Sequence, residues 1–266
     1  MKLLLGLIFL ATLCSLGQNK ITFHQPDYSC IITPEGKDAL DIYLTEKELI
    51  RSYPEKVTLS DEKQRGLNLK KKLLNEGLVI QQDQSFWTSY KNQLLAIQDI
   101  MNKLKLLNKW RFYNYELVYL NTEVENAFTL GGIIFITKGL LDLVKSKNQW
   151  AFILAHEMGH NELYHINYTL KREKGFGGLG AVFLAVQQTL LPSFNQFEEW
   201  EADVFACDVL NAAGYNLMDA IAFFDVLHKK ERKSENEDEF LKKILSSHPL
   251  HKERLECLKK HIRTTY

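Results

Sequence analysis

The chain has 266 residues, of which 45% are hydrophobic and 25% are charged, a composition typical of a folded globular protein with ample apolar material for a core. Lysine plus arginine and aspartate plus glutamate each number 33. The sequence therefore lacks the surplus of one charge that draws proteins to nucleic acid or to anionic membranes, and we expect no nucleic-acid partner.

Residues 1–17 resemble a secretory signal peptide. Lys2 precedes a short apolar run, and small residues precede a plausible cleavage point between Gly17 and Gln18. The run is shorter than the roughly 20 residues that cross a bilayer, so no permanent membrane span is expected. A lipid anchor on Cys14 is the weaker alternative, because a bulky leucine precedes that residue. This pattern predicts an exported protein, periplasmic or secreted.

Cleavage would leave three cysteines, at positions 30, 207 and 257. Three widely spaced cysteines cannot form a disulfide framework, so stability must come mainly from a packed core. One disulfide is possible, and the sequence does not identify the pair. Cys207 is expected to be a small buried residue.

The expected elements follow in chain order. Residues 18–60 are expected to be extended or irregular, because three prolines interrupt them. Beyond them, apolar residues recur at helical spacing, and most of the protein should be helical. Residues 117–120 and 133–136 are β-branched and aromatic runs that predict two strands of one small sheet.

A candidate metal site lies at His156-Glu157-Met158-Gly159-His160. Two histidines four apart on a helix are separated by about 40° and about 6 Å, so both imidazoles can reach one ion. A catalytic zinc needs a third protein ligand. Glu199 and Asp203 share one helix face, which allows Glu199 to bind the ion while Asp203 accepts the outer N–H of a ligand histidine. Glu201, on the opposite side, is the competing ligand.

Three residues near these motifs, Glu198, Glu201 and His165, also have interpretations other than metal binding. Glu198 and Glu201 are explained by a solvated acidic helix start. His165 lies roughly 140° round the helix from His160 and should not reach the metal.

Together these motifs resemble the gluzincin metallopeptidases that include the HtpX-like heat-shock proteases, the CAAX prenyl proteases and the periplasmic BepA-like proteins. The resemblance runs from about Tyr113 to Arg254. Besides the two ligand motifs, it rests on Asn126-Ala127-Phe128, Gly131-Gly132, Thr137-x-Gly139-Leu140-Leu141, His165, Ala213-Gly214-Tyr215, and His248-Pro249 with Arg254.

The resemblance implies an α+β, mostly helical fold: a zincin-like metallopeptidase core with a small antiparallel sheet, over residues 61–266. It implies Glu199 as the third ligand of one Zn²⁺ per chain. It also implies that Asn126 and Ala127 hold an extended peptide as an added strand. The absence of the membrane spans of some members points to a small soluble exported protein.

The sequence leaves two features open. His248 is a candidate oxyanion donor, a latency ligand that blocks the metal, or an ordinary loop residue. The apolar, glycine-rich stretch 175–191 is either a mobile lid between zinc ligands or part of the core.

The sequence thus predicts a zinc-dependent endopeptidase that hydrolyses exported or misfolded proteins through a zinc-activated water, with Glu157 as general base. Its partner would be a peptide or an unfolded protein. The alternative is an envelope assembly or quality-control factor with chaperone-like binding and a latent or structural metal site.

Overall fold

The structure is a computed structural model that describes residues 21–32, 37–52, 57–81, 84–107, 113–175, 194–225 and 252–266. Residues 1–17, His248 and residues 176–193 lie outside this part of the chain. The described elements are η1 (Tyr28–Cys30), α1 (Lys37–Ser52), α2 (Leu59–Asn75), α3 (Gln84–Leu106), β1 (Glu116–Leu120), β2 (Ala127–Leu130), β3 (Ile133–Thr137), α4 (Lys138–Leu143), α5 (Lys147–Glu162), α6 (His165–Gly175), α8 (Gln196–Ala213), α9 (Leu217–Ile221) and α12 (Lys252–Thr265).

The described residues form a mostly helical α+β fold with one small sheet, which confirms the predicted fold class. Both predicted strands are present, as β1 and β3, and β2 is a third. The strand order is β1-β3-β2. The chain reverses between β1 and β2 and again between β2 and β3, so β3 runs parallel to β1 and antiparallel to β2. The sheet is therefore mixed and not purely antiparallel as expected.

A tight hairpin joins β2 to β3. Its two connecting residues, Gly131 and Gly132, have φ values of 62° and 86°, and Leu130 pairs with Ile133 across the turn. A two-residue loop with positive φ at both positions has the backbone twist that antiparallel strands need, and glycine adopts it without steric cost. The glycine pair thus positions β2 at one edge of the sheet.

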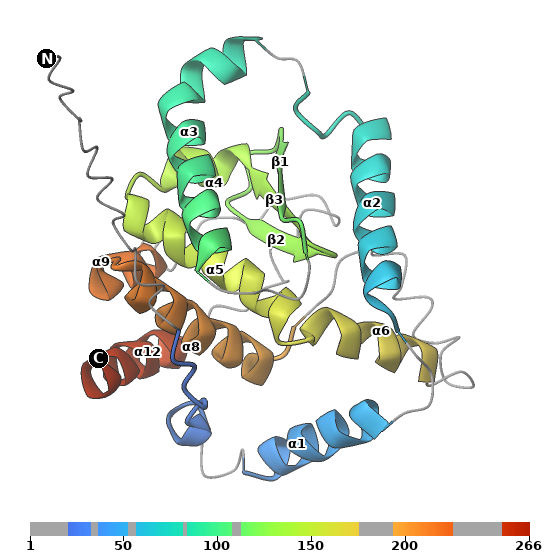
Figure 1. Cartoon of the computed structure of the whole chain (residues 1–266), viewed down its shortest axis with the longest axis vertical. Helices are drawn as coiled ribbons and strands as arrows, with labels where there is room; N and C mark the ends of the chain where they lie inside the picture. The colour runs from blue at the N-terminus through green and yellow to red at the C-terminus, as the bar shows by residue number, and fades with distance from the viewer. Residues whose placement is uncertain are drawn as a thin grey trace, which may run out of the picture.

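Both faces of β3 are buried, and its alternating side chains divide between two hydrophobic clusters. Ile134 and Ile136 pack in the main core with α5, whereas Ile133 and Phe135 join a smaller cluster with α2 residues such as Leu69. Helices thus cover both faces of the sheet, and Figure 1 shows α5 passing between the sheet and α8.

Helices α5 and α8 pack closely at the centre of the molecule. All residues of α5 from Trp150 to Asn161 are buried, the pattern of a helix surrounded by protein on all sides. A Cβ atom added at Gly159 would lie 3.1 Å from the ring of Phe205 and 3.3 Å from the Cα of Ala202. The small residue at position 159 therefore allows the two helices to approach each other.

The N-terminal segment differs from the irregular structure expected for residues 18–60. Residues 37–52 form helix α1, because Pro34 and Pro54 flank this stretch and do not interrupt it. Its inner face carries Tyr43, Lys47 and Ile50, spaced by four and three residues. Helix α2 begins at Leu59, so the expected boundary after residue 60 falls inside a helix. The assignment of separate domains stays a prediction.

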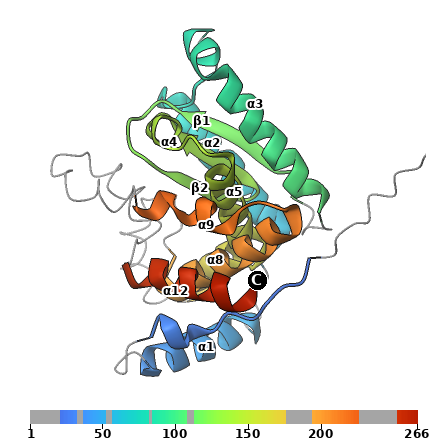
Figure 2. The ribbon, with the colours of Figure 1, turned by 90° about the vertical axis from the view of Figure 1, so that its left-hand side faces the viewer.

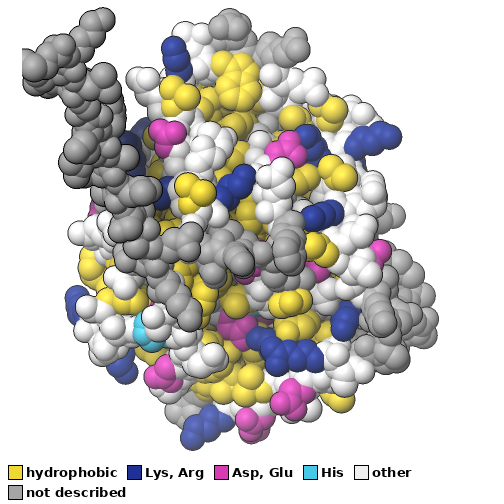
Figure 3. All heavy atoms as spheres, in the orientation of Figure 1, with side chains coloured by type: hydrophobic (Ala, Val, Ile, Leu, Met, Phe, Trp, Pro, Cys, Tyr) yellow, Lys and Arg dark blue, Asp and Glu magenta, His cyan; other side chains and the backbone are white. Residues whose placement is uncertain are grey.

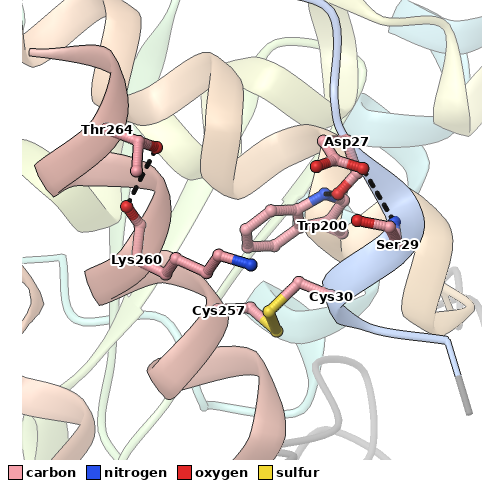
Figure 4. Close-up of a disulfide and its surroundings, with 7 residues drawn as sticks. All are labelled: Asp27, Ser29, Cys30, Trp200, Cys257, Lys260 and Thr264. Carbon is pink, nitrogen blue, oxygen red and sulfur yellow. Dashed lines mark hydrogen bonds between the residues drawn. A yellow bond between two sulfur atoms is a disulfide. The ribbon is translucent and has the colours of Figure 1, made fainter.

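Residues 21–32 are fastened to the C-terminal half of the chain. A disulfide joins Cys30 to Cys257 of α12, with 5.6 Å between their Cα atoms, and Figure 4 shows it beside Trp200. The indole of Trp200 donates to the backbone oxygen of Asp27 at 3.1 Å. Figure 2 shows α12 running alongside α8. The free Cys207 is buried, as expected.

None of the helices in the described ranges is long and apolar enough to cross a bilayer. Hydrophobic, basic and acidic side chains intermingle on the face shown in Figure 3, and on this face the described residues show no broad area of a single charge. This distribution accords with the balanced charge of the sequence.

We expect replacement of both Cys30 and Cys257 by serine to lower the free energy of unfolding by about 2–5 kcal/mol, because the disulfide closes a long loop and restricts the unfolded chain. Denaturant titration without reductant measures this effect. Reductant should destabilise the wild type by a similar amount and leave the double variant unchanged. Equal midpoints for the two oxidised proteins would show that the disulfide contributes no stability.

Candidate metal centre

Helix α5 places two histidines side by side in the interior. His156 is 6% exposed and His160 is fully buried. Their Nε2 atoms are 3.1 Å apart, as the spacing of four residues predicts. Glu157, between them in sequence, is also buried, at 2% exposure.

Helix α8 brings a carboxylate to the same point. Asn195 begins the helix with a capping box that involves Glu198, and Glu199 follows in the first turn, fully buried. One oxygen of Glu199 lies 3.3 Å from Nε2 of His160, and the other lies 3.5 Å from Nε2 of His156. The helix cap thus fixes the carboxylate beside both imidazoles.

These three side chains fit a zinc ion. Ligand atoms at about 2.0–2.1 Å from a tetrahedral ion are about 3.3 Å from each other. The two Nε2 atoms are 3.1 Å apart, one Glu199 oxygen is 3.3 Å from Nε2 of His160, and one ligand atom from each of the three residues lies within 4.8 Å of the others. Within the described residues, His156, His160 and Glu199 form the one group of three that could hold a metal ion. The competing carboxylate, Glu201, does not belong to this group.

Asp203 lies on the outer side of His156, where the sequence analysis expected it. Its Oδ1 is 3.0 Å from Nδ1 of His156. Since an ionised carboxylate can only accept hydrogen bonds, this contact favours a proton on Nδ1 and a lone pair on Nε2, the atom near Glu199 and His160.

Arg254 of α12 balances the buried carboxylates. Its Nη1 is 2.7 Å from Glu199, and its Nε and Nη2 contact Asp203 at 2.5 and 3.1 Å. Burial opposes the charge of Arg254, but the two carboxylates raise its pKa above the ordinary value. The sequence analysis noted Arg254 only as part of a family pattern. Its role needed the packing of α12 on α8.

The pKa values of His156 and His160 are shifted in opposite directions. Burial lowers the pKa of both, but Asp203 and Glu199 raise the pKa of His156 to about 10. The pKa of His160 stays well below its ordinary value, because burial and the neighbouring histidines outweigh the contribution of Glu199. A positive charge at the shared position is therefore favoured, as a proton on His156 or as a bound cation.

The expectation of a solvated acidic helix start is wrong for Glu198 and Glu201, which are both buried. Glu201 accepts hydrogen bonds from Lys47, at 2.7 and 2.6 Å, and from Tyr43, at 3.0 Å. Its Oε2 is also 3.0 Å from Nε2 of His165. Burial raises the pKa of Glu201, but the contacts with His165 and Lys47 lower it to about 2.

His165 does not belong to the metal group, as expected, but it contacts a member of it. Its Nδ1 lies 3.0 Å from Nδ1 of His160. The spacing of five residues gave no signal of this contact, because Leu163 ends α5 and Tyr164 has a φ of 68° before α6 begins. This turn brings His165 back toward the preceding helix.

The predicted peptide-binding residues lie at the start of β2. The backbone oxygen of Asn126 accepts from the Thr137 N–H at 3.1 Å. In antiparallel strands, hydrogen-bonded and non-hydrogen-bonded residue pairs alternate. Since Asn126 and Thr137 are hydrogen-bonded, the N–H and C=O of Ala127 point away from β3. Asn161 joins the β2–β3 hairpin to α5, the helix that carries His156 and His160. Its side chain accepts from the Gly132 N–H at 3.0 Å and donates to Thr129 at 2.7 Å. The sequence analysis missed this link.

The fold and these buried groups together define a metallopeptidase. Residues 93–176 and 169–262 match peptidase family M48, and the chain belongs to this family. The predicted enzyme class is thereby confirmed. The finer resemblance to HtpX-like, CAAX prenyl protease or BepA-like members stays a prediction.

Two curated relatives are similar to part of this chain, and each is named mitochondrial metalloendopeptidase OMA1. The protein from Arabidopsis thaliana is 28% identical over 159 residues, which cover 54% of this chain and 31% of the relative. The protein from Saccharomyces cerevisiae is 26% identical over 164 residues, which cover 57% of this chain and 47% of the relative. The chain thus matches less than half the length of either protein.

These relatives contradict the expected location. The sequence analysis predicted a periplasmic or secreted protein, whereas both curated relatives are named as mitochondrial. A short apolar run after one lysine is a pattern of composition, and it does not by itself specify a compartment.

We expect His160→Ala and Glu199→Gln to lose bound zinc, because each removes one of three ligands, whereas Glu201→Gln removes none and should retain zinc, although with weaker affinity. Elemental analysis of the purified, dialysed proteins measures the metal content. A full equivalent in either ligand variant, or loss of zinc from Glu201→Gln alone, would show that the ligand set is different.

Proposed function

We propose that this protein is a zinc endopeptidase in which His156, His160 and Glu199 hold one zinc ion. The observation that carries the proposal is that one ligand atom from each of these three buried side chains lies within 4.8 Å of the others, with the two Nε2 atoms 3.1 Å apart. Bound zinc supplies a Lewis acid that polarises the scissile carbonyl and makes water a nucleophile near neutral pH. The family match and the names of the two relatives support this activity.

Glu157 serves as the general base in this proposal. It directly follows His156 on α5, and its side chain is buried. A carboxylate here accepts a proton from the attacking water and returns it to the leaving amine. Asp203 orients the imidazole of His156 from behind.

An extended segment of an unfolded protein is the proposed substrate, bound along β2. Among the described strands, β2 has β3 as a neighbour on one side, and the backbone of Ala127 points to the other. A peptide added as a strand would bond to this edge. Asn161 supports the geometry, because it ties the hairpin to the helix that carries both histidines. Asn126 precedes this edge and anchors β2 to Thr137.

Glu157→Gln should lower the turnover of an unfolded protein substrate by about 100- to 10,000-fold while zinc content stays at one equivalent, because an amide cannot accept the proton from water. A peptidase assay with and without chelator, paired with elemental analysis, measures both quantities.

Asn161→Ala serves as a comparison in the same assay, because it weakens the hairpin contact without removing a proton acceptor from the reaction. Undiminished cleavage by Glu157→Gln would remove Glu157 from the mechanism. A wild type that holds zinc but cleaves no unfolded substrate would favour the assembly or quality-control factor with a latent or structural metal.

A further inference from the structure

We propose that His165 and Glu201 are positioning residues that fix the tautomer of His160, and that helix α1 holds them in place through Lys47 and Tyr43. The inference rests on the proposed zinc site. It assigns to His160 an outer support made of two residues, where His156 has the single carboxylate of Asp203. Neither the ligand motifs nor the family match identifies these partners.

The outer member of the supporting pair is Glu201, an ionised carboxylate. Glu201 accepts from Tyr43 at 3.0 Å and from the ammonium group of Lys47 at 2.7 and 2.6 Å. The hydroxyl of Tyr28 also donates to it. Since all three partners are donors, both oxygens of Glu201 act as acceptors. The Nε2 atom of His165, 3.0 Å away, must therefore carry a proton.

This protonation determines the remaining ring nitrogens. A neutral imidazole with its proton on Nε2 has a lone pair on Nδ1. Neutral His165 in this form accepts from Nδ1 of His160, 3.0 Å away. His160 then carries its proton on Nδ1 and presents the lone pair of Nε2, the atom that faces Glu199 and His156. The contacts from Glu201 through His165 to His160 together favour the tautomer that a metal ligand needs.

The residues that support His160 are shielded from solvent. His160 and His165 are both fully buried, and Glu201 is 6% exposed. Phe194 stacks on the His160 ring with a centroid separation of 3.7 Å. A buried carboxylate is costly without compensation, so Lys47 is needed to keep Glu201 ionised. If Glu201 were neutral, His165 would have no fixed proton position.

The stabilising donors come from a segment outside the family match. That match begins at residue 93, whereas Tyr28, Tyr43 and Lys47 belong to η1 and α1. Lys47 and Glu201 also line a cavity of about 590 Å³ between the N-terminal segment and α8. The N-terminal segment thus contributes to the metal site without touching the metal.

The test compares zinc affinity among full-length variants by chelator competition. We expect Glu201→Gln and His165→Gln to bind zinc roughly 10- to 100-fold more weakly than the wild type, the usual effect of losing an outer partner of a ligand. His165→Asn should retain more affinity than His165→Gln, because the asparagine oxygen can occupy the place of Nδ1 and accept from His160. Lys47→Met should weaken zinc binding through Glu201.

Asp208→Asn is the matched control. Asp208 is a buried carboxylate of the same helix, and it fastens the N-terminal segment through His24 at 2.6 Å. It does not contact His156, His160 or Glu199 in any described interaction. Its replacement leaves Tyr43, Lys47 and the Cys30–Cys257 disulfide in place, so zinc affinity should be unchanged. Thermal unfolding of the metal-free proteins then separates a loss of stability from a loss of affinity.

NMR of the histidine ring nitrogens provides an independent readout. In the zinc-loaded wild type, the Nδ1 proton of His160 should be protected from solvent exchange, and this protection should be lost in His165→Ala. Unchanged zinc affinity in both Glu201→Gln and His165→Gln, or an equal loss in Asp208→Asn, would overturn the inference. A wild type that binds no zinc would instead overturn the proposed function on which it rests.

Discussion

The structure depends on the burial of several charged groups at one helix contact. Glu199, Glu201 and Asp203 all lie on α8 within five residues, and all three are at most 6% exposed. Buried carboxylates are stable in a protein only when cations and hydrogen-bond donors compensate them. The close approach of α5 at Gly159 brings His156 and His160 to this row of acids, but the two histidines alone cannot balance it.

The remaining compensation comes from both ends of the described chain. Arg254 reaches Glu199 and Asp203 from α12, and Lys47 reaches Glu201 from α1. The disulfide between Cys30 and Cys257 joins these two regions, three residues from Arg254 and 17 residues from Lys47. The covalent link and the two cations therefore act together to hold α1 and α12 against α8. Segments far from the metal motif in sequence determine the charge state of the site.

The sheet takes part in the same arrangement. Asn161 lies one residue after His160 and contacts both the β2–β3 turn and Thr129. A displacement of β2 would therefore also displace α5, the helix that carries His156 and His160. In the proposed enzyme, this coupling would give the peptide on β2 and the zinc-binding residues of α5 a common support.

The sequence by itself determined the helix with His156, Glu157 and His160, the two strands over residues 117–120 and 133–136, and the shared helix face of Glu199 and Asp203. Each follows from spacing within a single element. Tertiary structure alone decided the roles of His165, Glu201, Lys47 and Arg254, because these contacts join residues from separate helices. It also decided that α1 is a helix and which cysteines pair. Local periodicity fixes the face on which a residue lies, but only packing decides what meets that face.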